Sequence, residues 1–169
     1  MQPKIKIQIQ SKNEVEVYLA SPHQFLIDNQ QQLLPDWDIP VNLLIIVLQK
    51  SAIALNELNK EVFREKDRLR AKFIHFGSNL IFTLQKRGYK SDLFDPRSGY
   101  PLLSRQGELT FDDNAAVKAS LNYRVISYQN CSLLDHPTWG NNVYPSTIVT
   151  SANLNTVELL LDQKQINPI

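Results

Sequence analysis

The chain has 169 residues, of which 43% are hydrophobic and 21% charged, and its formal net charge is +1. This length and composition are typical of one folded domain that buries about two-thirds of the surface of its unfolded chain. Basic residues are scattered and balanced by acidic ones, which argues against a nucleic-acid-binding role. The sequence therefore predicts a single domain over residues 1–169.

Cysteine usage and hydropathy narrow the class of protein further. Cys131 is the only cysteine, so neither an internal disulfide nor a CxxC-type zinc site can form. The longest apolar run, Leu43–Leu48, is far shorter than the ~20 residues that span a bilayer. The chain start resembles neither a secretory signal nor a mitochondrial leader. These features predict a soluble protein that does not bind membranes.

The first half of the chain predicts a hairpin, a helix and a central strand. Alternating apolar residues on both sides of residues 11–14 predict a β-hairpin. Ser21 and Pro22 predict the start of a helix that ends near Leu34, with serine as the N-cap. The run Leu43–Leu48 predicts a strand buried on both faces. The apolar hairpin positions are Ile5, Ile7, Ile9, Val15, Val17 and Leu19.

A helical period dominates the middle of the chain. Apolar residues recur at helical spacing from Val62 onwards and predict an amphipathic helix that ends at Arg87. Gly88 is suited to the left-handed stop of this helix. Residues 51–61 either extend the helix or form a separate loop. The apolar positions include Val62, Leu69, Phe73, Phe76, Leu80 and Leu84.

The second half interleaves short strands and helices without regular βαβ repeats. This pattern favours an α+β fold with a mostly antiparallel sheet. The expected elements are a strand over 89–94, a tight turn over 95–99, a helical turn after Asn114, strands over 121–131 and 143–152, and a helix over 156–163.

The clearest candidate site lies between residues 121 and 140. Pro137 biases His136 toward extended backbone, so a loop is expected there. Cys131 is therefore predicted to lie near the end of a strand, where a loop begins. Rigid elements often position functional groups on loops, although a lone cysteine is also often a small buried hydrophobe.

Other side chains allow a functional and a structural interpretation. His136 could donate a proton near Cys131 or cap its own loop. Trp139 could stack on a macrocycle or anchor the loop in the core. Asp95, Arg97 and Ser98 could bind a partner, although a tight turn also explains that segment.

Several motifs in fixed order carry a family resemblance. The segments concerned are Gly88-Tyr89, Phe94-Asp95-Pro96-x-Ser98-Gly99, Phe111, Leu121, Cys131 and His136-x-x-Trp139-Gly140, with Leu43–Gln49 and Lys72-Phe73 further upstream. In this order the chain resembles the methylmalonic aciduria and homocystinuria type D protein family, also called the CblD family. The similarity runs from about residue 14 to about residue 153.

The resemblance implies a cobalamin-trafficking adaptor rather than an enzyme. It implies a nitroreductase-like α+β domain without flavin, which docks on the type C cobalamin-processing chaperone. It further implies that the cofactor is routed to methionine synthase or methylmalonyl-CoA mutase, and that a thiolate coordinates the cobalt of partner-bound cobalamin. The candidate cofactor-binding residues are Cys131, His136 and Trp139, and the resemblance implies Cys131 as the cobalt ligand.

One departure from the family pattern and one rival function stay open. The family carries two adjacent cysteines where this chain has Asn130 and Cys131, so either position could correspond to the cobalt ligand. The rival is a flavin oxidoreductase of the nitroreductase fold. Such enzymes bind the flavin phosphate with arginines near the chain start, whereas the first arginine here is Arg64. No GxSxG, GxGxxG, GxxxxGK or HExxH motif points to another enzyme class.

Overall fold

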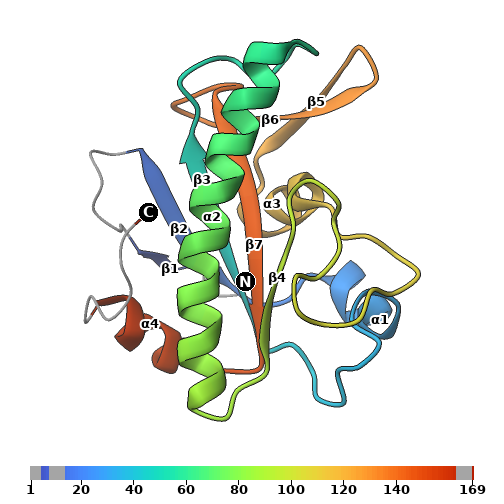
Figure 1. The fold of residues 1–169 in the computed structure, drawn as a ribbon, viewed down its shortest axis with the longest axis vertical. Helices are drawn as coiled ribbons and strands as arrows, with labels where there is room; N and C mark the ends of the chain where they lie inside the picture. Colours follow the sequence, from blue (N-terminus) through green and yellow to red (C-terminus); the bar gives the residue numbers. More distant parts are fainter. Residues whose placement is uncertain (1–4, 8–13, 163–168) are drawn as a thin grey trace.

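The fold is known from a computed structural model that describes residues 5–7, 14–162 and 169 (Figure 1). In chain order, the elements are β1 (Ile5–Ile7), β2 (Val15–Ala20), α1 (Gln24–Leu33), β3 (Leu43–Lys50), α2 (Lys60–Lys86), β4 (Ser91–Phe94), α3 (Asp113–Leu121), β5 (Arg124–Tyr128), β6 (Cys131–Asp135), β7 (Val143–Thr150) and α4 (Leu154–Asp162).

Two antiparallel sheets organise the described residues. The larger has five strands in the order β1-β2-β3-β7-β4, and β5 pairs with β6 in a separate hairpin. Each pairing between these strands is antiparallel. The predicted α+β class with a mostly antiparallel sheet is confirmed.

The central strand β3 is buried on both faces, as its apolar run predicted. Side chains alternate across a strand, and those of β3 enter two separate hydrophobic clusters. Leu43, Ile45 and Val47 pack with α2 and α4, whereas Leu44, Ile46 and Leu48 pack with α1 and α3. The sheet therefore lies between two layers of helices (Figure 1).

The long helix begins and ends where local chemistry dictates. Asn59 caps α2, because its Oδ1 accepts a hydrogen bond from the Val62 N–H at 2.9 Å. Gly88 follows the helix with a φ of 87°, the left-handed conformation that glycine tolerates best. Residues 51–59 form a loop, which settles the open question about this segment.

Other predicted boundaries need correction or fall outside the described residues. Helix α1 begins at Gln24 with His23 as N-cap, not at Ser21-Pro22, because β2 continues to Ala20 and the next residues connect the two elements. β1 and β2 form the predicted hairpin, but Ile9, most of its turn and the last residue of the predicted helix 156–163 lie outside the described residues. No helix within the described ranges has both the length and the apolar character needed to cross a membrane.

Strand β7 has two partners along only half of its length. It pairs with β3 from Val143 to Thr150 but with β4 only from Thr147 to Thr150. Pro145, which has no N–H to donate, lies in the half that β4 does not reach. Proline is suited to strand positions beside an open edge. Space is therefore left beside the first half of β7.

Close packing of α2 on the sheet supplies the first prediction. A Cβ on Gly77 would lie 2.6 Å from Cδ2 of Leu93, which is fully buried. We expect Gly77→Val to lower the free energy of unfolding by about 1–3 kcal/mol, because overpacking forces neighbours from their rotamers. Urea denaturation measures this change. The exposed Lys72→Ala change on the same helix is the control, and equal midpoints for both variants would contradict the prediction.

Candidate functional site

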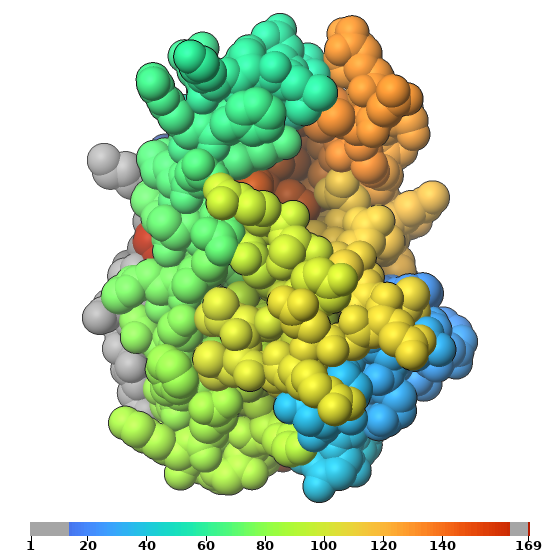
Figure 2. Space-filling view, turned by 45° about the vertical axis from the view of Figure 1, so that its right-hand side comes forward, coloured from blue at the N-terminus to red at the C-terminus, as the bar shows by residue number. Residues whose placement is uncertain are grey.

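A cavity of about 810 Å³ opens beside the first half of β7. Figure 2 shows this hollow between α2 in green and the β5–β6 hairpin in orange, with β7 in red at its floor. Its walls come from α2, the turn after β4, the start of α3, strand β6 and the start of β7. Segments far apart in the sequence thus form one site.

Two ion pairs attach the turn after β4 to α2. The Arg70 guanidinium donates to both carboxylate oxygens of Asp95, at 2.7 and 2.6 Å. This interaction holds the pKa of Asp95 below its ordinary value. Arg97, on the cavity rim, pairs with Asp67 on α2. Residues 95–99, predicted as a tight turn with a possible partner-binding role, therefore form part of the cavity wall.

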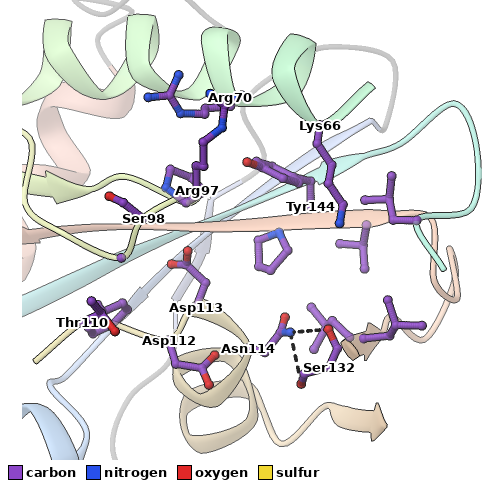
Figure 3. A pocket seen from close by; sticks show the side chains of 18 of the residues that line it. Lys66, Arg70, Arg97, Ser98, Thr110, Asp112, Asp113, Asn114, Ser132 and Tyr144 are labelled. Carbon is purple, nitrogen blue, oxygen red and sulfur yellow. Dashed lines mark hydrogen bonds between the residues drawn. The ribbon is translucent and has the colours of Figure 1, made fainter. Parts of the chain in front are cut away.

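Asp113 projects from the start of α3 toward the interior of the cavity (Figure 3). Its Oδ1 accepts a hydrogen bond of 2.7 Å from the Thr147 hydroxyl on β7. The side chain is densely surrounded by protein, and solvent reaches it through the cavity. Loss of hydration raises the pKa of Asp113 from 3.8 to about 7. A carboxyl group that changes protonation near neutral pH is a frequent property of functional sites.

Tyr144 and Lys66 complete the polar lining. The Tyr144 side chain is only 8% exposed, and burial is the main reason that its pKa is raised. Lys66 reaches into the cavity from α2, on the side opposite Asp113 (Figure 3). Neither the Tyr144 hydroxyl nor the Lys66 amine makes a hydrogen bond within the described residues. Both groups are therefore available to a ligand.

Cys131 is the first residue of β6 and not, as predicted, near the end of a strand. The expected strand over 121–131 needs correction, because Leu121 ends α3 and a hairpin begins at Arg124, in which Tyr128 pairs with Cys131 across a two-residue turn. The turn residues Gln129 and Asn130 have φ values of 44° and 66°, as in the type I′ turns that suit tight hairpins. Cys131 is partly exposed and lies on the same face as Leu133, which lines the cavity.

The two positions that could correspond to the family cysteines differ in backbone conformation. Residue 130 lies in the left-handed region, which asparagine tolerates better than most residues with a Cβ. Residue 131 has ordinary strand pairing. A thiol at 131 is thus compatible with the local backbone, whereas one at 130 would occupy a strained position.

His136 holds the other end of β6. It is 3% exposed, and its Nδ1 accepts hydrogen bonds from the backbone N–H groups of Thr138 and Trp139, both at 3.1 Å. Because Nδ1 is an acceptor, the ring proton lies on Nε2, which donates to Glu16 at 3.1 Å. These contacts fix the loop after β6 to strand β2.

Trp139 and Tyr123 enclose the imidazole. The Trp139 and His136 rings stack with centroids 4.1 Å apart, and Tyr123 meets the same ring edge-on at 5.4 Å. The Tyr123 hydroxyl also lies 3.1 Å from that of Tyr18. The structure therefore brings His136 and Trp139 together at the base of the hairpin.

Cys131 and His136 are too far apart to interact directly. Cys131 begins β6 and His136 follows its last residue, and an extended strand separates such positions by roughly 16 Å. A Cys–His catalytic pair is therefore excluded. No group of three or more histidine, cysteine, aspartate or glutamate residues in the described ranges is arranged to hold a metal ion.

Sequence reasoning did not identify the cavity residues Lys66, Arg70, Asp113 and Tyr144 as a site. Arg70 lies inside the predicted amphipathic helix and Asp113 directly before the predicted helical turn, and no functional role was predicted for either residue. The acidic residues before α3 do carry one local signal, because Asp112 caps this helix through the Ala115 N–H. That signal predicts a helix start but not burial of the next carboxyl group.

Comparisons with known proteins find one family model and relatives that share one name. A family model described as "Methylmalonic aciduria and homocystinuria type D protein" matches residues 2–161. The cobalamin trafficking protein CblD of Rattus norvegicus is 24% identical over 142 residues, which are 84% of this chain and 48% of that protein. The Homo sapiens protein of the same name is 25% identical over 138 residues, 82% of this chain and 47% of that protein.

A more distant relative carries the same name. The cobalamin trafficking protein CblD of Gallus gallus is 22% identical over 139 residues, 82% of this chain and 47% of that protein. The chain thus spans about half the length of the curated relatives it matches. Each of these relatives carries the name of a cobalamin trafficking protein.

The His136 contacts at the base of the hairpin yield a second prediction. We expect His136→Ala to lower the free energy of unfolding by roughly 1–3 kcal/mol, because two backbone N–H groups lose their acceptor. Urea denaturation followed by tryptophan fluorescence measures the loss. Thr138→Ala, which alters an exposed side chain in the same loop, should leave the midpoint unchanged. Equal midpoints for wild type and His136→Ala would show that the ring does not stabilise the loop.

The Asp113 carboxyl group yields a third prediction, on pH. Its folded-state pKa is about 7 and its ordinary value is 3.8, so between these values the folded state binds more protons than the unfolded state. Stability from this group is therefore greatest below pH 3.8 and falls as pH rises to 7. We expect Asp113→Asn to be more stable than wild type at pH 8, by at most about 4 kcal/mol, and the difference to shrink toward pH 4.

Denaturation of both proteins across this pH range tests the sign. The exposed Asp28→Asn change should follow the wild-type curve. A gain for Asp113→Asn that stayed constant from pH 4 to 8 would contradict a raised pKa.

Proposed function

Because the chain belongs to the methylmalonic aciduria and homocystinuria type D protein family, we propose that it works in cobalamin trafficking as an adaptor. The family match covers residues 2–161, which confirms the resemblance seen in the sequence and extends it at both ends. The related proteins carry the name cobalamin trafficking protein. We expect the adaptor to dock on a type C cobalamin-processing chaperone and to help pass the cofactor to methionine synthase or methylmalonyl-CoA mutase.

The position of Cys131 carries this proposal. Its side chain is partly exposed beside the turn of a two-stranded hairpin, where a second protein can approach. A thiolate is a soft, anionic donor suited to a transition metal. In this role the sulfur contacts the cobalt of cobalamin that the chaperone still holds, and the cobalamin is cargo rather than a resident cofactor.

His136 and Trp139 act in this proposal by supporting the hairpin. The imidazole uses both ring nitrogens within the protein, and Trp139 covers one of its faces. Trp139 also packs against the hydrophobic cluster under α1 and α3. A rigid base positions Cys131 at the other end of β6, because a strand transmits orientation along its length.

The remaining parts of the proposal concern fold ancestry and compartment. We expect a nitroreductase-like domain that no longer uses flavin, and a cytoplasmic location. The flavin oxidoreductase alternative has less support, because the relatives are named for cobalamin trafficking and the first arginine is Arg64. A purified protein with a yellow flavin spectrum would favour that alternative.

The fourth prediction tests the thiol directly. Wild type and Cys131→Ser are each mixed with cobalamin loaded on a type C chaperone, and the visible cobalt spectrum is recorded. We expect a spectral shift with wild type only, since serine offers no thiolate. An equal shift from both proteins, or none from either, would remove Cys131 from the mechanism.

Two control variants separate the thiol from its surroundings. Ser127→Ala alters an exposed side chain on the other strand of the hairpin and should keep the wild-type shift. Asn130→Cys combined with Cys131→Ser moves the thiol into the turn, where a left-handed φ of 66° disfavours it. We expect this double variant to give a weaker shift than wild type, and a stronger one would assign the ligand to position 130.

A further inference from the structure

The cavity beside the hairpin is lined by polar groups that have no part in the proposed contact between the Cys131 thiolate and cobalt. Its volume of about 810 Å³ falls within the range of roughly 300–1,000 Å³ for small-molecule sites. Ser132, the residue after Cys131, is part of its wall. Cys131 is not one of the lining residues, but it precedes three of them on β6, so a molecule that contacts its sulfur lies close to the cavity.

One wall offers a cationic group to an anion. Lys66 points into the space from α2 (Figure 3) and makes no hydrogen bond or ion pair with a described residue. The two arginines in the wall, in contrast, are held by Asp95 and Asp67. Among these three cations, Lys66 is the one free to bind a phosphate oxygen.

The opposite wall offers hydrogen-bond acceptors. Asp113 accepts one hydrogen bond, through Oδ1 from Thr147, and Oδ2 makes none within the described residues. The phenol of Tyr144 lies on β7, beside Lys66 (Figure 3), and also lines the cavity. These groups match a ligand that brings its own hydroxyl groups.

Apolar surface also lines the cavity, at the edge of the α2 wall and on β6 and β7. Phe63 is 50% exposed at the edge of the cavity, and Leu133 and Pro145 line it further. A simple anion would make no contact with this apolar surface and would give Asp113 no hydrogen-bond donor. A simple amine would be repelled by the positive charge of Lys66. A molecule with a flat apolar base, sugar hydroxyls and a phosphate satisfies all three surfaces.

We propose that the cavity binds the nucleotide tail of cobalamin while the chaperone presents the cofactor to Cys131. This inference rests on the proposed trafficking function. The tail consists of an aromatic base, a ribose and a phosphodiester, and it is mobile when its base is not bound to cobalt. Lys66 holds the phosphate, Asp113 accepts from a ribose hydroxyl, and the base lies on the apolar surface beside Phe63.

The fifth prediction compares two corrinoids on the same chaperone. Cobinamide has the corrin ring of cobalamin but lacks the nucleotide. We expect wild type to bind the cobalamin-loaded chaperone roughly tenfold more tightly than the cobinamide-loaded one, because a charge-assisted contact is lost. Titration calorimetry measures both affinities, with equal loading checked by absorbance.

Variants on α2 assign the effect to the cavity. Lys66→Ala should bind the cobalamin-loaded chaperone as weakly as the cobinamide-loaded one, with its affinity for the latter unchanged. Lys72→Ala, which removes an exposed lysine outside the cavity, should behave as wild type. The free tail, α-ribazole phosphate, should shift the backbone NMR signals of Ser132 and Tyr144 in wild type and not in Lys66→Ala.

The experiments distinguish failure of the cavity assignment from failure of the proposed trafficking function. Equal affinity for the two loaded chaperones, with the thiol-dependent spectral shift retained, would overturn the cavity assignment and leave the trafficking function standing. Absence of a complex with either loaded chaperone would overturn the trafficking function and this inference with it. A tenfold preference that persisted in Lys66→Ala would also overturn the assignment of the phosphate site.

Discussion

The uneven pairing of β7 determines where this protein has a site. Its whole length is hydrogen-bonded to the buried strand β3, so its position in the sheet is fixed. On the other side β4 reaches only Thr147, and Pro145 removes one donor from the strand half that β4 leaves open. Helix α2, the start of α3 and the β5–β6 hairpin surround this open half without filling it. The cavity therefore follows from the sheet topology, and its chemistry from the side chains that surround the gap.

Patterns within one element were sufficient to predict most of the fold. In each of three elements the spacing of apolar residues reflects which faces of that element are buried. Apolar residues alternate in β2, are continuous in β3 and follow the helical period in α2. Gly88 likewise marks the end of α2, because its left-handed conformation is a local requirement. Where local signals competed, the prediction was wrong. Ser21 and Pro22 are good helix-start residues, but β2 occupies the chain up to Ala20 and delays the helix to Gln24.

The site was predicted less completely because most of its features are not local. Gln129 and Asn130 lack the glycine that usually identifies a two-residue hairpin turn, so the β5–β6 hairpin looked like one strand with Cys131 near its end. The Arg70–Asp95 pair joins residues 25 positions apart, and the contact of Thr147 with Asp113 spans 34. Neither burial of a carboxyl group nor the partner of an arginine can be obtained from residue type alone. Cys131, His136 and Trp139 stood out because rare residue types and a family resemblance mark them.

Asp113 shows why the cavity is more than a packing defect. As the first residue of α3 its carboxylate is favoured by the helix dipole and by the Thr147 hydroxyl, yet burial outweighs both and raises its pKa. An asparagine at this position could accept the same hydrogen bond without the cost of desolvating a charge. Local conflicts of this kind are expected at functional sites. The carboxylate stands opposite the Lys66 amine, which pairs with none of the described residues, across a space lined by Leu133 and Pro145. A carboxylate that lowers stability because it is poorly hydrated becomes favourable when a ligand supplies a hydrogen-bond donor, which is the physical reason to assign this space to a ligand.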